Sequence, residues 1–219
     1  MKLFFLGINY KTGKGGVATV LSENNKIFPN ATFISTSDSN IFRKIYYGIS
    51  AIFKCVFLPI IYPKAIFHIH GSSYNSFHRK YIYFRILKFY NVKLIYHIHG
   101  AEYHLFNESS NIKTKEKIKY FINNVDCVIC LSSYWKDFFL NHFNPKKIEV
   151  VANIVAIPKI QKLPSNDRLN FLFLGHISER KGVWLLLEVI ESMKEQLKGQ
   201  VIFDFGGNGE IEKFQKLII

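Results

Sequence analysis

The sequence has 219 residues, of which 48% are hydrophobic, and it carries a formal net charge of +13. This length suits one large domain or two small ones, and the apolar fraction suits a packed core, so wholesale disorder is excluded. Three cysteines are too few for a disulfide framework, and the run of small and apolar residues at 3–8 is too short for a secretory signal peptide. We therefore expect the protein in the reducing cytoplasm.

The excess positive charge lies in the first part of the chain. Residues 1–160 contain 21 Lys and Arg against 8 Asp and Glu, whereas residues 161–219 contain 8 of each kind. Such a surplus fits nucleic acid, an anionic membrane or a phosphate-bearing substrate as partner. An AT-rich genome, which inflates Lys, Ile, Asn, Phe and Tyr, is the alternative explanation.

Strand-like and helix-like segments alternate along the chain. Short runs rich in Ile, Val and Phe predict strands at residues 2–8, 31–35, 65–70, 92–99, 126–131, 148–151, 169–174 and 201–205. Stretches with helical spacing separate most of them, at residues 17–26, 41–58, 75–90, 114–124, 135–143 and 181–198. This alternation predicts an α/β fold with a parallel sheet and helices on both of its faces.

The predicted helix at 41–58 is very apolar, and we expect Pro59 to end it. Lysines and prolines interrupt the surrounding apolar run, which argues against a membrane-spanning segment. Its basic residues Arg43, Lys44 and Lys54 alternate with aromatic ones, a pattern that suits a helix lying on an anionic bilayer. A buried helix with two solvated ends is the commoner explanation of the same pattern.

Proline and polar residues at 153–168 mark a linker. We therefore divide the chain into a domain at 1–160 and a second one at 161–219. The second domain offers two strands, one helix and the start of another, which is too little to cover both faces of a parallel sheet. We expect a fragment of a longer two-domain protein; the alternative is a small C-terminal arm docked on the first domain.

Glycines follow the first strand, at Gly13-Lys14-Gly15-Gly16, and precede a helix. Glycines in this place let backbone N–H groups approach an anion at a helix N-terminus. The spacing matches neither the phosphate-binding P-loop nor the dinucleotide fingerprint. The loop therefore indicates a phosphate site or a tight turn.

Two strands end in the same tetrapeptide, His68–Gly71 and His97–Gly100. Alternate strand residues share a face, so both histidine pairs are expected at the carboxyl ends of parallel strands, where open α/β sheets bind ligands. We expect one satisfied core histidine in each pair and one that faces the cleft. A metal site is the less favoured alternative. Cys127 and Cys130 lie three residues apart on a strand and therefore point to opposite faces, which argues against a zinc or redox pair.

Two further turns follow predicted strands in the last part of the chain. Ser178–Gly182 opens a helix with Arg180 and Lys181 at its positive end, which favours a bound anion because two cations are otherwise misplaced there. Phe205–Glu210 repeats the arrangement of strand, glycine turn and helix start. A solvated basic turn remains the alternative for the first of these.

Taken in order, these motifs resemble the retaining glycosyltransferases of family 4, which have the GT-B fold. The resemblance also covers Asp126–Ser132, Val150–Asn153 and Phe173–Gly175. It implies a Rossmann-like N-terminal domain on the acceptor side, followed here by the first βα units of a second Rossmann-like domain. That second domain takes a nucleotide-diphosphate sugar as the donor substrate, with no metal or other cofactor.

The resemblance also implies roles for single residues. Arg180 and Lys181 bind the donor diphosphate, and Gly15 and Gly16 reach the same phosphates. His99 lies beside the donor sugar as the candidate catalytic residue. Donor-binding positions near the nucleotide are Gly207 and Asn208.

This chain departs from the family pattern in two places. Asn153 is followed by Ile154 where glycine is usual, and the late pair of glutamates eight positions apart is missing. Glu108 and Glu116 have this spacing by chance. We therefore expect the chain alone to be inactive or nearly so.

The expected acceptor is a lipid-linked glycan in surface polysaccharide synthesis, with the basic domain on the inner membrane leaflet. Two alternatives stay open. One is a basic nucleic-acid-binding module, although no RNA-binding signature is present. The other is a sugar-nucleotide epimerase of GT-B type, which shares the donor but not the acceptor.

Overall fold

The computed structural model describes residues 1–13, 15–155 and 168–218. The chain forms two compact units, Met1–Ile157 and Pro158–Ile219. The predicted domain boundary after residue 160 and most of the predicted linker lie outside the described residues.

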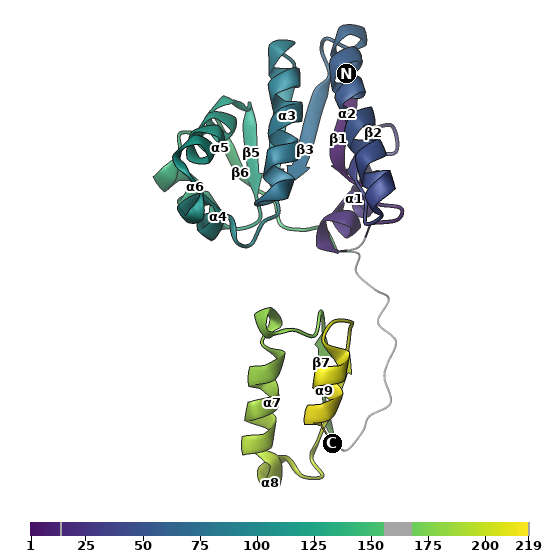
Figure 1. Cartoon of the computed structure of the whole chain (residues 1–219), viewed down its shortest axis with the longest axis vertical. Coiled ribbons are helices and arrows are strands. Elements are labelled where there is room, and N and C mark those ends of the chain that lie inside the picture. Colours follow the sequence, from purple (N-terminus) through teal and green to yellow (C-terminus); the bar gives the residue numbers. More distant parts are fainter. Residues whose placement is uncertain (14, 156–167, 219) are drawn as a thin grey trace. The chain divides into compact units, whose positions relative to one another are not determined.

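The first unit contains a six-stranded parallel sheet with the strand order β2-β1-β3-β4-β5-β6 (Figure 1). Its strands are β1 (Leu3–Ile8), β2 (Thr32–Ser37), β3 (Ile66–Gly71), β4 (Lys93–Ile98), β5 (Cys127–Cys130) and β6 (Ile148–Val150). Each of them lies within two residues of its predicted bounds. The alternating α/β pattern read from the sequence is therefore confirmed.

Six helices connect these strands: α1 (Gly16–Ile27), α2 (Ile41–Ile61), α3 (Asn75–Phe89), α4 (Tyr103–Ser109), α5 (Ile112–Asn124) and α6 (Ser133–His142). Three of them begin at a residue whose side chain accepts backbone N–H groups of the first turn, namely Asn40, Asn111 and Ser132. The short helix α4 was not predicted, because two turns are too few to show a helical period.

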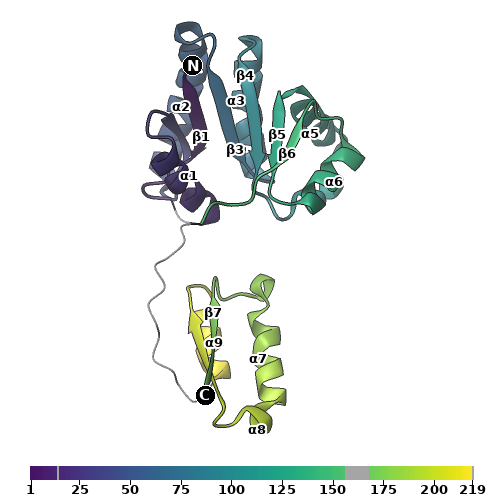
Figure 2. The ribbon, with the colours of Figure 1, turned by 180° about the vertical axis from the view of Figure 1, so that it is seen from behind.

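The buried core of the first unit lies on one face of its sheet. Phe67, Ile69 and Tyr96 point to this face and pack with side chains from α2 to α6. Helix α1 packs on the opposite face (Figure 2). Phe28, at the C-terminal end of this helix, contacts Phe5 of β1. The right-handedness of crossover connections explains why α1 lies on one face and the later helices on the other. The connection from β1 to β2 crosses the sheet in one direction, and the later connections cross it in the opposite direction.

Helices lie on both faces of the sheet, as predicted, but they cover the second face less completely than the first. Beside α1, the second face of the sheet carries an apolar groove of about 460 Å³, whose lining includes Leu3, Ile66, Ile95 and Ile129. His68 and His97 also line this groove. The histidine-bearing face of the sheet is thus less covered than the core face.

Helix α2 corrects two expectations. It continues through Pro59 to Ile61: the proline lacks an N–H and crowds the preceding turn, but the helical bond from Tyr62 N–H to Leu58 O, at 2.8 Å, is still made beyond it. The helix is also not a buried one: its buried residues are Ala51, Cys55 and Pro59. By length and composition alone α2 is able to cross a membrane, which the lysines and prolines of the sequence had argued against.

The second unit contains two parallel strands, β7 (Leu169–Leu174) and β8 (Val201–Gly206), with a 3-10 helix at Glu179–Lys181. The predicted helix at 181–198 is divided at Met193 into α7 (Val183–Ser192) and α8 (Lys194–Leu197), and α9 (Ile211–Leu217) follows β8. Its small core consists of Ile177, Val183 and Phe214 with partly buried neighbours.

Candidate functional site

The sheet of the first unit changes its winding direction between β1 and β3. The chain goes from β1 to β2 on one side and returns over β1 to β3 on the other. Open α/β sheets bind ligands in the crevice at the carboxyl ends of strands at such a point. The topology therefore directs attention to the residues that follow β1, β2 and β3.

A pocket of about 350 Å³ lies at this switch point, and we call it the switch-point pocket. The strand ends contribute Ile8, Thr36, Ser37, His70 and Gly71; the start of α1 contributes Gly15, Gly16 and Val17; the β3–α3 turn and α3 contribute Ser72, Ser76, Arg79 and Lys80. No Asp or Glu is among these residues. The lining therefore offers mainly hydrogen-bond donors and cations.

The predicted residues Gly15 and Gly16 line this pocket at the N-terminus of α1. Gly15 is the N-cap residue of α1 and has a φ of +99°. Residues that carry a Cβ rarely adopt this backbone conformation. A Cβ added at Gly15 or Gly16 would meet no atom within 4 Å. The open space lies where the free N–H groups of a helix N-terminus favour an anion. Lys14 lies outside the described residues.

Lys80 on α3 is a lining residue that the sequence analysis missed. Its side chain is 2% exposed, and its ammonium group donates to the hydroxyl of Thr36. Burial lowers the pKa of Lys80 to about 7, and the nearby Arg79 guanidinium acts in the same direction. The sequence does contain a signal for the burial of Lys80. Helical spacing places it on one stripe of α3 with Phe77, Phe84 and Leu87, and that stripe is buried.

Asp38 lies beyond the end of β2 but does not neutralise Lys80. Its carboxylate accepts hydrogen bonds from the Thr12 hydroxyl at 2.6 Å, from Asn9 Nδ2 at 3.1 Å and from Asn40 N–H at 3.1 Å. These bonds, with the Thr12 hydroxyl first, lower the pKa of Asp38 to about 2. The carboxylate is thus engaged in its own loop.

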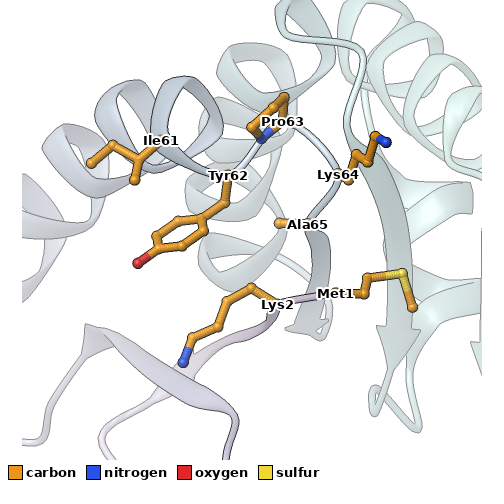
Figure 3. A pocket seen from close by; sticks show the side chains of 7 residues that line it. All are labelled: Met1, Lys2, Ile61, Tyr62, Pro63, Lys64 and Ala65. Atoms are coloured by element: carbon orange, nitrogen blue, oxygen red, sulfur yellow. The ribbon is translucent and has the colours of Figure 1, made fainter.

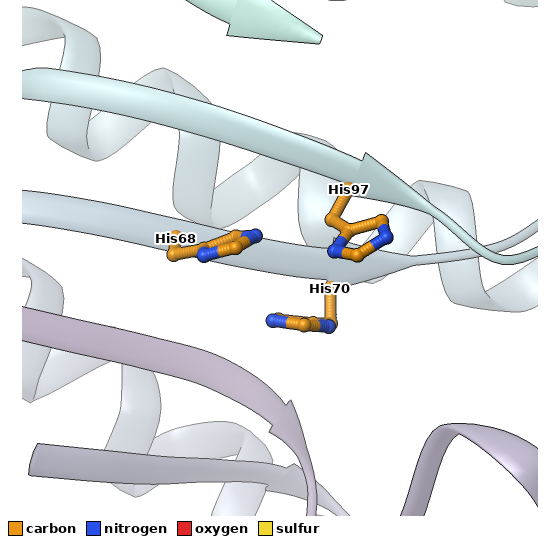
Figure 4. A group of neighbouring side chains, drawn as sticks. All are labelled: His68, His70 and His97. Atoms are coloured by element: carbon orange, nitrogen blue, oxygen red, sulfur yellow. The ribbon is translucent and has the colours of Figure 1, made fainter. Parts of the chain in front are cut away.

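Four histidines stack on one face of β3 and at the end of β4. Figure 4 shows His68, His70 and His97. Ring centroids are 4.4 Å apart for His68 and His70, 4.9 Å for His70 and His97, and 4.2 Å for His97 and His99. His70 Nδ1 lies 2.9 Å from His99 Nε2. This contact links the predicted residue His99 to a side chain that lines the switch-point pocket.

Each pair contains one buried histidine, His70 or His97, and one half-buried histidine, but it is the buried His70 that lines the switch-point pocket. The buried members are also not fully satisfied: among the described residues, His70 Nε2 and both ring nitrogens of His97 have no hydrogen-bond partner. Burial lowers the pKa of His68 to about 3, of His97 to about 2 and of His99 to about 4. All of these imidazoles are therefore neutral at pH 7.

The histidine stack also bears on the metal question. One ligand atom from each of His68, His70 and His97 lies within 4.8 Å of the others, so the donor set by itself suits a metal such as zinc. The rings of His68 and His97 are within 18° of parallel, and those of His68 and His70 within 26°. Lone pairs lie in the ring planes, so stacked rings direct them side by side and not toward one ion. The arrangement therefore fits a metal poorly.

The predicted residues of the second unit lie at the carboxyl edge of β7 and β8. Ile177 N–H bonds Asn208 O at 2.7 Å, and Glu210 N–H bonds Ile177 O at 2.9 Å, so the turns after the two strands run side by side. Arg180 and Lys181 occupy the 3-10 helix, and Gly182 (φ +74°) starts α7 directly after them. Both cations thus precede the N-terminus of α7.

Gly207 is required by close backbone packing. A Cβ at this position would overlap the carbonyl oxygen of Gly175 in the turn after β7. Gly207 and Asn208 are both exposed. The structure therefore brings Arg180, Lys181, Gly207 and Asn208 to one edge of the second unit.

The predicted site residues thus form two groups. Gly15, Gly16 and His99 gather around the switch-point pocket of the first unit, and the other four gather in the second unit. A shared phosphate site between Gly15–Gly16 and Arg180–Lys181 stays a prediction, because the two groups belong to different units.

Comparison with known proteins gives a consistent assignment. The family described as Glycosyltransferase Family 4 matches residues 47–157. An uncharacterized 41.2 kDa protein in the cps region of Klebsiella pneumoniae is 26% identical over 83% of this chain and 58% of its own length. An uncharacterized glycosyltransferase of Methanocaldococcus jannaschii is 27% identical over 46% of this chain and 28% of its own. The phosphatidylinositol N-acetylglucosaminyltransferase gpi3 subunit of Schizosaccharomyces pombe is 29% identical over 48% of this chain and 24% of its own.

Two solved structures share the fold. TarM superimposes with a TM-score of 0.56 and 21% identity, over 76% of this chain and 33% of its own. Sucrose-phosphate synthase from Thermosynechococcus elongatus superimposes with a TM-score of 0.55 and 12% identity, over all of this chain and 73% of its own. The α/β fold class of GT-B type is confirmed. The chain spans less than two thirds of each of the three curated relatives.

Proposed function

The chain belongs to glycosyltransferase family 4, and from this membership we propose that the protein transfers a sugar from a nucleotide-diphosphate sugar to an acceptor. The family assignment is the observation that carries the proposal. We also propose that the anomeric configuration of the sugar is retained and that the acceptor is a lipid-linked glycan. The name of the fission-yeast relative, which contains phosphatidylinositol, supports a lipid on the acceptor side.

The leaving group of this reaction is a nucleoside diphosphate, whose negative charge grows in the transition state. In our proposal Arg180 and Lys181 bind that diphosphate together with the N-terminus of α7, while Gly207 and Asn208 contact the nucleotide. Groups that meet developing charge in a dry site contribute about 2.7–4 kcal/mol each. This proposal needs no metal cofactor, because cations and helix N–H groups take the charge. Gly15 and Gly16 approach the same phosphates, and His99 lies beside the donor sugar.

Isothermal titration calorimetry of the whole chain with uridine and guanosine diphosphates tests the donor site. We expect one of them to bind, and Lys181→Met to weaken the binding at least tenfold. Lys194→Met is the matched control, since Lys194 is an exposed lysine that pairs with Glu191 at 3.2 Å. Binding of neither nucleotide, together with tight binding of single-stranded RNA, would favour the nucleic-acid module instead. Once an acceptor is found, the proton coupling of the product's anomeric centre tests retention.

We further propose that the first unit rests on the anionic cytoplasmic leaflet of a membrane through α2. The outer surface of this helix exposes large apolar side chains, among them Phe42 (80% exposed), Tyr46 (67%), Phe53 (59%) and Ile60 (63%). The helix contains Arg43, Lys44 and Lys54 but no acidic residue. An apolar surface flanked by cations complements an anionic bilayer.

More positive charge flanks the C-terminal end of α2. Lys2 and Lys64 border a pocket of about 470 Å³ beside Ile61 (Figure 3). This pocket adjoins the amino ends of β1 and β3, away from the strand ends that suit catalysis. Its lysines serve in our proposal as contacts for lipid headgroups, each worth about 1 kcal/mol near the surface.

Flotation with vesicles that contain phosphatidylglycerol tests the membrane contact. We expect the chain to float with these vesicles, and the double variant Phe53→Asp/Phe57→Asp to remain at the bottom. Phe89→Asp is the control, because Phe89 on α3 is 85% exposed but lies outside this surface. Raising the salt to 0.5 M should weaken flotation of the unmodified chain. Equal flotation of all three proteins would contradict the proposal.

A further inference from the structure

The switch-point pocket contains a positive charge that the fold leaves without a counterion. Within the described residues no ion pair joins Lys80 to a carboxylate, and the nearby cation Arg79 lowers the pKa of Lys80 further. Asp38 is occupied by Thr12, Asn9 and Asn40. A buried ammonium group with one hydroxyl partner is unfavourable by itself, since burial without a counterion penalises the charged form.

The remaining donors around the pocket point to the kind of group that would satisfy Lys80. Ser72 and Ser76 line the pocket with Arg79, whose Nε has no hydrogen-bond partner in the part of the chain that the structure describes. His70 is 1% exposed, and its Nε2 likewise has no partner there. The N-terminus of α1, which the proposed function assigns to the donor phosphates, borders the other side of the pocket. Two cations, two hydroxyls and an imidazole without a carboxylate form a lining for a further oxyanion.

The position of α2 indicates which substrate provides this oxyanion. The inner side of α2 packs on α3, where the Tyr83 hydroxyl donates to Gly48 O at 3.3 Å. The buried Cys55 of α2 lies close enough to Lys80 to influence the pKa of that lysine. The outer side of the same helix is the apolar surface described above. A lipid-linked molecule held at that surface is therefore one helix away from Lys80, and the whole pocket lies within the first unit.

We propose that the switch-point pocket binds a phosphate group of the acceptor substrate, with Lys80 and Arg79 as the cations that hold it. This inference rests on the proposed function, because it assigns a substrate group to the acceptor side of the same reaction. Binding places the dianion against Lys80 and supplies the counterion that the fold lacks. A bidentate guanidinium contact from Arg79 fixes its orientation.

The test is calorimetric binding of inorganic phosphate, geranyl phosphate and uridine diphosphate to the whole chain. We expect geranyl phosphate to bind more tightly than inorganic phosphate, and Lys80→Met to weaken both at least tenfold while leaving uridine diphosphate within twofold. Lys113→Met, an exposed lysine on α5, is the control and should change none of the three. The melting temperature of Lys80→Met should equal or exceed that of the unmodified chain, because a buried lone charge has been removed.

Other outcomes overturn the proposal. Unchanged binding of geranyl phosphate to Lys80→Met would mean that the pocket holds no acceptor phosphate. Loss of uridine diphosphate binding alone would assign the pocket to the donor. Should Lys80→Met fail to fold, Arg79→Gln provides the same comparison, since Arg79 is only half-buried. The assay needs no turnover, so a failure of sugar transfer and a failure of this site are distinguishable.

Discussion

The histidine stack should make the fold sensitive to mild acid. His68, His97 and His99 have pKa values of about 3, 2 and 4, chiefly because burial disfavours the imidazolium form. In the unfolded chain the same groups titrate near a pKa of about 6.5. Above pH 6.5 these imidazoles are neutral in both the folded and the unfolded chain, so the fold has its full stability there. That stability is lost as the pH falls from about 6.5 towards 4, because the unfolded chain binds protons that the fold rejects.

The expected size of this loss follows from the linkage relation. At pH 5.0, an imidazole that is protonated in the unfolded chain but neutral in the fold lowers the free energy of unfolding by about 2 kcal/mol. The three histidines together give about 6 kcal/mol, and His70, whose pKa burial also holds well below its ordinary value, acts in the same direction. A domain has a stability of only about 5–15 kcal/mol. Moving from pH 7.5 to 5.0 should therefore remove much of the stability of the first unit.

Urea unfolding followed by circular dichroism, from pH 7.5 to 5.0, measures this loss. His97→Leu replaces an imidazole with two unpartnered nitrogens by an apolar side chain of similar size. We expect this variant to lose about 2 kcal/mol less stability than the unmodified chain over the same range. His142→Gln, at an exposed position on α6, should leave the pH dependence unchanged. Identical pH dependence for the chain and His97→Leu would refute the reasoning.

Two other predictions concern single residues. Gly207→Ala should destabilise the second unit by about 1–3 kcal/mol, because its Cβ overlaps Gly175 O, and faster amide exchange in β7 and β8 would show it. Gly175→Ala, whose Cβ meets only the Phe173 ring at 3.7 Å, is the control, and equal exchange in both variants would contradict the argument. Between pH 7 and 9 the chain should gain up to about 1.4 kcal/mol of stability per pH unit, since the pKa of Lys80 is about 7 in the fold and about 10.4 when unfolded. Chemical denaturation of Lys80→Met should show no such gain, and an equal gain would exclude Lys80 as its source.

Sequence periodicity was sufficient for the sheet because buried parallel strands are short and continuously apolar. Gly15–Gly16, the repeated His-x-His-Gly strand ends and the turn at Ser178–Gly182 follow strands directly, so their place at the carboxyl edge of a sheet follows from chain order alone. Family resemblance added the roles, and the structure adds that Gly15 and Gly16 line one pocket and that His99 contacts His70, which lines the same pocket.

Burial on a helix was harder to predict, because helical spacing shows which residues share a face but not whether that face is covered. Helix α2 was expected to be a core helix, yet most of its length is exposed. Lys80 shows the converse, since a lysine is assumed to reach solvent and its place in the stripe Phe77, Phe84 and Leu87 was overlooked. In both cases the packing of α2 on α3 decides which side chains are buried, and that contact joins residues far apart in the sequence.

Several unfavourable features of the first unit lie near the switch-point pocket. Among the described residues Lys80 is a buried amine with no carboxylate partner, and His70 and His97 contain ring nitrogens without a hydrogen-bond partner. Natural folds keep such local costs where a function requires them. Lys80 and His70 both line the pocket where the winding of the sheet reverses, beside Gly15 and Gly16. Thermodynamics and topology, which are independent arguments, therefore select the same few residues as the working part of the first unit.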